Sequence, residues 1–315
     1  MPGLLDRRLL FVTGKGGVGK TTVAAALGLL ASRSGKRTLV CEIDAKGDLA
    51  DFFECGPTSF EPREVSAGLF AMTMETEASL KEYLRLQVRL PLISRIGPLA
   101  RAFDFLANAA PGVKEILTVG KPVWETRQRN YDLVVVDAPA TGHIVGLLRA
   151  PSAINELVSV GLIREQTGWM IELLADPATT GVVIASSPEE MPVVESLELI
   201  ERLKDTDVDV AAIVVNRVLP ELFGRAEEEV FEELRTPALT EALGEAAGGP
   251  VGDVLEAARL AVTLRRTRAG HLTRLREEVD PALPVLYVPE LFNRSSGGLR
   301  TVAQVADALG AELEG

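Results

Sequence analysis

Cysteine and histidine are scarce in this sequence. Its 315 residues include two of each, and the cysteines are Cys41 and Cys55. Two thiols cannot build a disulfide framework or a four-thiolate metal site within one chain, and two imidazoles leave little for a histidine-rich metal centre. The sequence therefore argues against a disulfide-stapled secreted protein, and we expect a reducing, cytoplasmic compartment.

Long apolar runs and an excess of basic residues are also missing. No stretch reaches the ~18 apolar residues that span a bilayer, and the apolar segment Leu9–Val12 is too short for the core of a signal peptide. With 33 basic and 45 acidic residues the formal net charge is −12, which repels nucleic-acid phosphates. We therefore expect a soluble protein with no nucleic-acid partner and no stable membrane insertion.

What the chain does contain is a series of apolar runs that alternate with segments of helical spacing. Continuous runs of valine and isoleucine are typical of parallel strands that helices cover on both faces. The predicted strands are Leu9–Thr13, Thr38–Ile43, Leu69–Met74, Leu133–Val136, Gly181–Ala185, Val210–Val215 and Val285–Val288. The predicted helices include Thr21–Ser34, Val254–Val279 with Asp253 as a candidate N-cap, and Val302–Leu313. The pattern predicts an α/β fold in which residues 1–315 form a single domain.

Two stretches interrupt this alternation, at about residues 77–126 and 152–175. Both have apolar residues at helical spacing, and the first is broken by Pro91, Pro98 and Pro111. We predict a helical subdomain inserted on one end of the sheet. Because apolar helical spacing more often marks a core than a binding groove, we interpret these residues as the core of a small helical layer.

A glycine-rich segment follows the first predicted strand and opens the first predicted helix. Residues 14–22, Gly-Lys-Gly-Gly-Val-Gly-Lys-Thr-Thr, fit the phosphate-loop pattern G-x-x-x-x-G-K-[ST]. Glycines let backbone N–H groups surround phosphate oxygens, and the helix N-terminus adds its positive dipole end. Lys20 would bridge the β- and γ-phosphates of ATP, and the Thr21 hydroxyl would ligate Mg²⁺. The predicted nucleotide-binding residues here are Gly14, Lys15, Gly16, Gly17, Val18, Gly19, Lys20, Thr21 and Thr22.

Aspartates follow two of the predicted strands. Asp44 is expected to end the second strand and Asp137 the Val134–Val136 strand. The carboxyl ends of parallel strands share one edge of the sheet, where ligands bind in open α/β folds. Carboxylates attract Mg²⁺ directly or through water, so Asp44 and Asp137 join Thr21 as candidate metal ligands.

The second lysine of the loop, Lys15, gives a more specific signal. The form G-K-G-G-V-G-K-T-T resembles the deviant Walker A loop of the P-loop superclass that holds MinD, ParA, the nitrogenase iron protein and the arsenite-pump ATPase ArsA. The resemblance implies a P-loop NTPase fold. It also implies that Lys15 crosses a dimer interface to the partner's nucleotide, in a homodimer or a heterodimer with a paralogous chain. A solvated loop lysine is the simpler alternative.

Two further segments resemble the arsenite-pump and tail-anchored-protein-targeting ATPases. Residues 44–53 are similar to that family's first switch, D-P-A-H-x-L-x-D-x-F, and residues 137–143 to its second, D-T-A-P-T-G-H. The resemblance implies that Asp51 positions the attacking water. It implies that Asn216 reads the adenine and that Pro289 and Leu291 belong to a loop that closes over the base. Catalytic roles then fall to Asp51, Lys15 and Lys20.

The chain also departs from the family pattern. Ala45 and Gly47 replace the proline and histidine of the first switch, and the second-switch proline is displaced to Pro139. The cysteines supply neither the zinc-binding C-x-x-C pair of eukaryotic targeting factors nor the thiol triad of the arsenite pump. A methionine-rich groove for a transmembrane helix lacks support as well, since methionine is sparse in the helical segments.

The resemblance implies a cytoplasmic, Mg²⁺-dependent, dimeric ATPase that couples nucleotide-dependent closure to a protein or membrane-protein client. Three alternatives stay open on the residues alone. They are a metalloid-efflux ATPase subunit, a MinD- or ParA-like positioning ATPase, and a scaffold that binds ATP without turnover. The missing thiols disfavour the first. The net negative charge disfavours the second, which needs a basic DNA face or membrane-binding tail.

Overall fold

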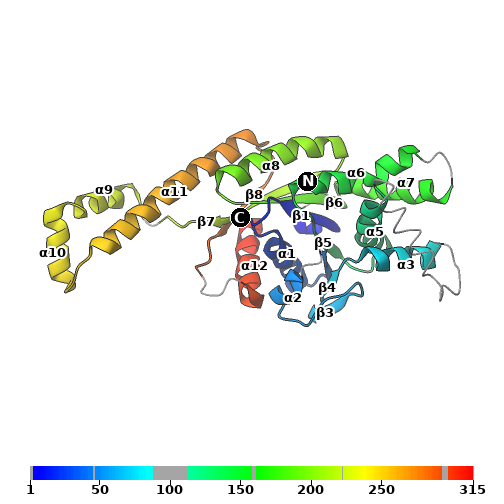
Figure 1. Cartoon of the computed structure of the whole chain (residues 1–315), viewed down its shortest axis with the longest axis horizontal. Coiled ribbons are helices and arrows are strands. Elements are labelled where there is room, and N and C mark those ends of the chain that lie inside the picture. Colours follow the sequence, from blue (N-terminus) through cyan, green and yellow to red (C-terminus); the bar gives the residue numbers. More distant parts are fainter. Residues whose placement is uncertain are drawn as a thin grey trace.

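One mixed sheet forms the centre of the molecule (Figure 1). The computed structural model describes residues 3–44, 47–87, 112–157, 161–221, 223–292 and 297–314. Its strands are β1 (Leu9–Gly14), β2 (Thr38–Glu42), β3 (Arg63–Ser66), β4 (Leu69–Thr73), β5 (Leu133–Asp137), β6 (Thr180–Ser186), β7 (Val210–Val218) and β8 (Val285–Pro289). Their order is β3-β4-β2-β5-β1-β6-β7-β8, and every neighbouring pair is parallel except β3 with β4. The predicted mostly parallel sheet is confirmed, and β3 is an edge strand that the sequence analysis missed.

Helices cover both faces of this sheet. They are α1 (Lys20–Arg33), α2 (Asp48–Phe52), α3 (Thr76–Gln87), α5 (Val113–Gln128), α6 (Thr141–Leu157), α7 (Leu162–Ala175), α8 (Glu190–Leu203), α9 (Arg225–Leu234), α10 (Pro237–Ala247), α11 (Gly252–Glu278) and α12 (Gly298–Glu314). Successive strand residues point to opposite faces, so Leu10 and Val12 pack with α1 and α12 whereas Leu9 and Phe11 pack with α5, α6 and α8. The α/β class with two covered faces is confirmed. Within the described part of the chain, no helix is both long and apolar enough to cross a membrane.

The central position of β1 decides where the functional loop lies. β1 pairs with β5 on one side and β6 on the other, with Val12 opposite Asp137 and Val183. The chain goes from β1 toward β2 on one side of it and reaches β6 on the other only later. The loop after β1 is therefore at a switch point of the sheet, beside the carboxyl ends of β5, β6 and β7.

The structure describes the two ends of the first stretch of the predicted helical insert. α3 and α5 lie in the first stretch, and residues 88–111, with all three of its prolines, are outside the described residues. The second stretch differs from expectation, because α6 begins at Thr141 and runs through Pro151, so residue 152 is no boundary. Trp124 of α5 and Trp169 of α7 meet edge to face with ring centroids 6.2 Å apart. This contact agrees with the interpretation of these apolar side chains as a helical core.

A second group of helices projects from the sheet as an arm, which we define as residues 225–267 (Figure 1, yellow to orange). It contains α9, α10 and the first part of α11. The sequence analysis expected only α11 here and placed Asp253 at its N-cap. That placement is wrong: Val251 is the N-cap and Asp253 lies in the first turn. The α10–α11 connection is a loop, as predicted, and it begins at Gly248, whose φ of 72° ends α10 in a left-handed conformation.

Candidate functional site

The glycine-rich segment forms a loop between β1 and α1. Two of its glycines are required by close approach of other groups. A Cβ at Gly14 would lie 2.0 Å from the Ala185 carbonyl oxygen of β6, and a Cβ at Gly19 would lie 2.4 Å from Nδ2 of Asn216; both have positive φ angles, 152° and 96°. A Cβ at Gly16 or Gly17, by contrast, would meet nothing within 4 Å. The loop is thus held closely by the sheet at its two ends and is open in its middle, which is the geometry of a phosphate cradle.

The first turn of α1 places Thr21 against the end of β5. The Thr21 hydroxyl donates a hydrogen bond of 2.6 Å to Oδ2 of Asp137. The other carboxylate oxygen, Oδ1, is buried and has no hydrogen-bond partner. Burial raises the pKa of Asp137 to about 6, while the Thr21 hydrogen bond and the charge of Lys20 oppose this rise. An acceptor oxygen that is buried without a partner is unfavourable unless a ligand completes it.

These groups fit a magnesium ion. Mg²⁺ is usually held by one or two protein oxygens together with phosphate oxygens and waters, and Asp137 and Thr21 offer a carboxylate and a hydroxyl side by side. Consistent with this sparse protein shell, the described residues contain no group of three or more His, Cys, Asp or Glu side chains arranged for a metal. Bound there with ATP, the ion would neutralise charge on the phosphates.

Asp44 lies differently from the sequence expectation. β2 ends at Glu42 rather than at Asp44, and Asp44 is two residues further on and exposed. The expectation that Asp44 ends the strand was wrong because the ladder with β4 and β5 closes at Glu42, opposite Thr73 and Asp137. A metal-binding role for Asp44 stays a prediction.

Glu42 is a site residue that the sequence analysis missed. It is buried beside Asp137 in the sheet, and its Oε1 accepts a hydrogen bond of 3.0 Å from the backbone N–H of Asp48, the first residue of α2. Burial raises the pKa of Glu42, against the effect of the Asp48 and Thr73 hydrogen bonds. Glu42 therefore anchors the first-switch helix to the sheet. An acidic residue at the end of an otherwise apolar run was the available signal.

The predicted water-positioning residue, Asp51, is on α2 but is exposed. Two other residues of the same helix, Asp48 and Phe52, line a cavity beside the phosphate loop, described below. The carboxylate of Asp51, which the resemblance predicts to be catalytic, is therefore not part of the cavity wall in this conformation. His143 of the second switch is likewise exposed at the start of α6, while Thr13 ties that switch to β1 through a hydrogen bond of 2.7 Å to the Pro139 carbonyl oxygen.

A cavity of about 610 Å³ opens beside the loop, within the range of pockets that hold ligands of nucleotide size. It is lined by Gly16, Gly17, Gly19, Lys20, Thr21, Thr22, Asp48, Phe52, Glu189, Asn216, Arg217, Arg268, Pro289, Glu290, Leu291, Gly297, Thr301 and Val305. The three residues predicted to contact adenine, Asn216, Pro289 and Leu291, thus share one cavity with the phosphate loop. Asn216 is buried, and its Nδ2 donates to the Val18 carbonyl oxygen at 2.9 Å.

The two lysines of the loop occupy different environments. Lys20 lines the cavity, and its Nζ donates to the Lys15 carbonyl oxygen at 3.4 Å. Lys15 is not among the cavity-lining residues of the described chain. Its ammonium pairs with Glu195 of α8, which also accepts a hydrogen bond of 3.0 Å from the Thr141 hydroxyl. Lys15 holds the pKa of Glu195 below its usual range. The sequence analysis did not anticipate Glu195, because 180 residues separate it from Lys15.

Comparison with known proteins agrees with this geometry. The model of the anion-transporting ATPase family matches residues 7–167 and 162–235. The chain belongs to this family. The ATPase BagA of Mycobacterium tuberculosis is 32% identical over 305 residues, which cover 90% of this chain and 86% of that protein. An ATPase ASNA1 homolog of Entamoeba dispar is 27% identical over 254 residues, covering 67% of this chain and 76% of that protein.

A third relative is the Halobacterium salinarum protein named as a candidate arsenical pump-driving ATPase. It is 28% identical over 295 residues, which cover 86% of this chain and 44% of that protein. The resemblance to the arsenite-pump and targeting ATPases is therefore confirmed, as is the P-loop fold. Membership of this ATPase family implies a nucleotide-binding chain. The individual residue roles stay predictions.

Proposed function

We propose that this protein is a Mg²⁺-dependent ATPase that hydrolyses ATP to ADP and phosphate as a dimer. The observation that carries the proposal is the contrast between the two loop lysines. Lys20 faces the cavity of its own chain, whereas Lys15 points to Glu195 on α8. Because Lys15 does not line the cavity of its own chain, it can serve a second chain once its pair with Glu195 opens. This supports the trans role that the deviant loop implies.

Each residue then has a stated part in the proposed reaction. Backbone N–H groups of residues 16–19 and the Lys20 ammonium bind the phosphates. Thr21 and Asp137 hold the magnesium ion, with Asp44 a further candidate. Asp51 orients the attacking water once α2 moves toward the phosphates, and Lys15 of the partner chain stabilises charge in the transition state. Asn216, Pro289 and Leu291 hold the base.

The pair between Lys15 and Glu195 gives this switch a resting state. Glu195 also binds Thr141 at the start of α6, so one carboxylate holds both the trans lysine and the second switch. Lys15 must leave Glu195 before it can reach a partner's nucleotide. The partly exposed position of the pair, with side chains 31% and 26% exposed, keeps the electrostatic cost of this exchange small.

Complementation between inactive chains tests the dimer. Lys15→Ala and Asp51→Ala should each abolish hydrolysis, since each lacks one half of every composite site. In an equimolar mixture, half of the dimers are hybrids and each hybrid has one intact site, so activity should return to about a quarter of the wild-type rate. Phosphate release measures it.

Lys81→Ala is the matched control, because Lys81 is an exposed lysine paired only with Glu77 among the described side chains. It should retain full activity. Hybrids that are as inactive as both parents contradict the trans-lysine model. A Lys15→Ala chain that hydrolyses ATP normally contradicts it as well.

We further propose that dimer closure is coupled to binding of a protein or membrane-protein client in the cytoplasm. The family resemblance supports the client, and the two free cysteines support a reducing compartment. Asp51→Asn protein should be trapped with ATP and should retain a client during affinity capture from its native cytosol. Lys20→Ala protein, which cannot hold ATP, is the control. Recovery of the same proteins on both variants contradicts nucleotide-dependent coupling.

A further inference from the structure

The helix α11 connects the arm to the nucleotide cavity. Its 27 residues extend over about 40 Å as one continuous helix. Val254, near the start, is 68% exposed on the arm, and Leu275, near the end, is 1% exposed in the core under the sheet. Arg268 lies between them and lines the cavity. One continuous helix therefore begins on the exposed arm, contributes a side chain to the cavity near its middle and ends in the core. Figure 1 shows its course from the arm back to the sheet.

The surroundings of Arg268 leave its guanidinium incompletely satisfied. Its side chain is 19% exposed, and its nearest carboxylate oxygen, Oε1 of Glu189, is 3.6 Å from Nη2, too far for a good hydrogen bond. Its Nε is buried and has no hydrogen-bond partner. Four described arginines have such a nitrogen, namely Arg7, Arg235, Arg265 and Arg268, and of these only Arg268 lines the cavity. A buried N–H donor without a partner, here the Nε of a partly buried guanidinium, is unfavourable unless a ligand completes it.

A second guanidinium belongs to the same wall. Arg217, at the end of β7, lines the cavity and has a φ of 61°, a left-handed conformation that is uncommon for arginine. Its backbone N–H donates to Oδ1 of Asn216 at 3.0 Å. Three carboxylates also line the cavity, Asp48, Glu189 and Glu290, so the wall is mixed in charge. Arg217 belongs to a strand of the sheet, whereas Arg268 belongs to α11, the helix that also forms part of the arm.

We propose that Arg268 donates hydrogen bonds to oxygens of the bound nucleotide and thereby ties the arm helix to nucleotide occupancy. The inference rests on the proposed function of the cavity as an ATP site. Without nucleotide, the loose pair with Glu189 partly neutralises the guanidinium. With nucleotide, charge-assisted hydrogen bonds replace that pair. Because α11 is continuous, a contact at Arg268 restrains the orientation of residues 252–267 in the arm.

Calorimetric titration of MgATP and MgADP tests the contact. Arg268→Ala should weaken ATP binding about tenfold or more, as loss of a charge-assisted hydrogen bond predicts. Arg268→Lys should restore part of the affinity. Arg259→Ala, the control on the same helix, removes an exposed arginine that pairs with Glu256 on the arm and should bind ATP as the wild type does.

Glu189→Gln distinguishes a ligand contact from a structural ion pair. If Arg268 binds nucleotide, releasing it from Glu189 should leave ATP affinity unchanged or increase it. If the pair only supports the fold, Glu189→Gln and Arg268→Ala should weaken binding equally, and the double variant should be no weaker than either. The second pattern overturns the proposal, as does wild-type affinity in Arg268→Ala.

The coupling to the arm has its own readout. Hydrogen exchange in residues 225–247 should slow when MgATP binds to the wild type and should not slow in Arg268→Ala at saturating MgATP. An arm that exchanges identically with and without MgATP in the wild type overturns the coupling.

Lys20→Ala separates the two proposals. Wild-type protein that fails to bind ATP overturns both, whereas ATP binding that needs Lys20 but not Arg268 overturns only this inference.

Discussion

The sheet and the arm are built in opposite ways. In the sheet, strand residues such as Leu10 and Phe11 are completely buried between two helical layers. On the arm, Val254 and Leu260 of α11 are 68% and 67% exposed. Burial of apolar surface is the main source of stability in the first region. Among the described residues of the arm, fewer apolar side chains are buried, namely Phe231, Leu255 and Val262, and surface ion pairs add to them.

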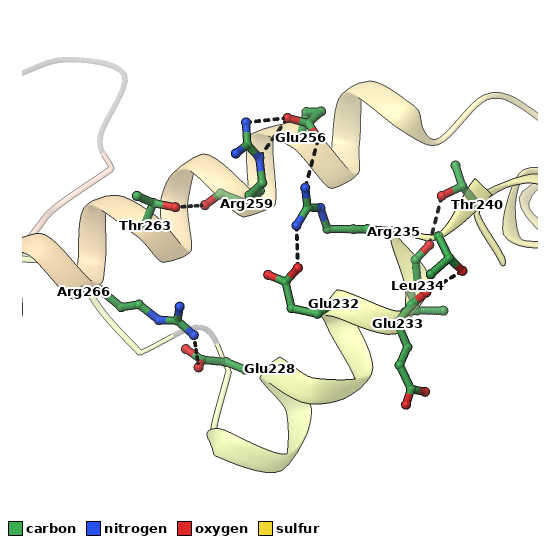
Figure 2. A network of polar contacts seen from close by, with 11 residues as sticks. Glu228, Glu232, Glu233, Leu234, Arg235, Thr240, Glu256, Arg259, Thr263 and Arg266 are labelled. Atoms are coloured by element: carbon green, nitrogen blue, oxygen red, sulfur yellow. Dashed lines mark hydrogen bonds and ion pairs between the residues drawn. The ribbon is translucent and has the colours of Figure 1, made fainter. Parts of the chain in front are cut away.

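Figure 2 shows the contacts that join the helices of the arm. Arg235 lies between Glu232 of α9, at 2.5 Å, and Glu256 of α11, at 3.5 Å, and Arg266 pairs with Glu228. Such exposed pairs are individually weak. The phosphate loop is therefore set in a large continuous core, while the arm depends on fewer buried side chains and on exposed ion pairs.

The largest expected difference between the two regions is in the free energy of unfolding that a leucine-to-alanine substitution removes. Leu27→Ala in α1 removes a fully buried side chain and should lower the free energy of unfolding by about 2–5 kcal/mol. Leu260→Ala on the arm should change it by no more than about 0.5 kcal/mol. Urea unfolding followed by circular dichroism measures both.

Equal losses of unfolding free energy in Leu27→Ala and Leu260→Ala would contradict the difference in burial between the sheet and the arm. A large loss for Leu260→Ala would mean that the arm is covered in solution, by a second chain or by another protein. Dilution would then separate the cases, because stability that comes from a second copy depends on protein concentration.

A smaller effect is expected from the ion pairs of the arm. Glu256→Gln removes the shared partner of Arg235 and Arg259, and it should lower the free energy of unfolding by less than about 1 kcal/mol at low salt. The difference should vanish at high ionic strength because salt screens exposed charges. Urea unfolding at two salt concentrations measures it, with Glu241→Gln, an acidic residue of α10 for which no ion pair is described, as the control. A loss that persists in high salt would show that the pair is more buried than in this structure.

Much of the site could be predicted because its parts are contiguous in sequence. The phosphate loop needs glycines, a lysine and a threonine at fixed spacing between a strand and a helix, so residues 14–22 revealed it directly. Asp137 followed from its place after a valine run. The resemblance assigns Asn216, Pro289 and Leu291 to the adenine, and the fold brings all three to the cavity beside the phosphate loop; their role stays a prediction.

Other site residues could not be found this way. Glu195 and Arg268 lie on helices with no local pattern that points to nucleotide. Glu195 reaches the loop because α8 packs on β6, and Arg268 reaches the cavity because α11 packs on α8. Asp44 is a case in which a local pattern misled. An aspartate after an apolar run predicts the end of the strand there, but β2 ends at Glu42. A strand ends where its ladder ends, and the ladder is set by neighbours distant in sequence.

The α/β class, the phosphate loop and the family could all be recognised from the amino-acid sequence, because they depend on residues close together along the chain and on backbone geometry that glycine favours. The folded chain was needed to show that Glu195 meets Lys15 and that Arg268 lines the cavity. Lys15 and Glu195 are 180 residues apart, and Arg268 meets the loop residues of the cavity across a still longer stretch of chain. These two pairings follow from how helices pack on and beside the sheet, which no local pattern specifies.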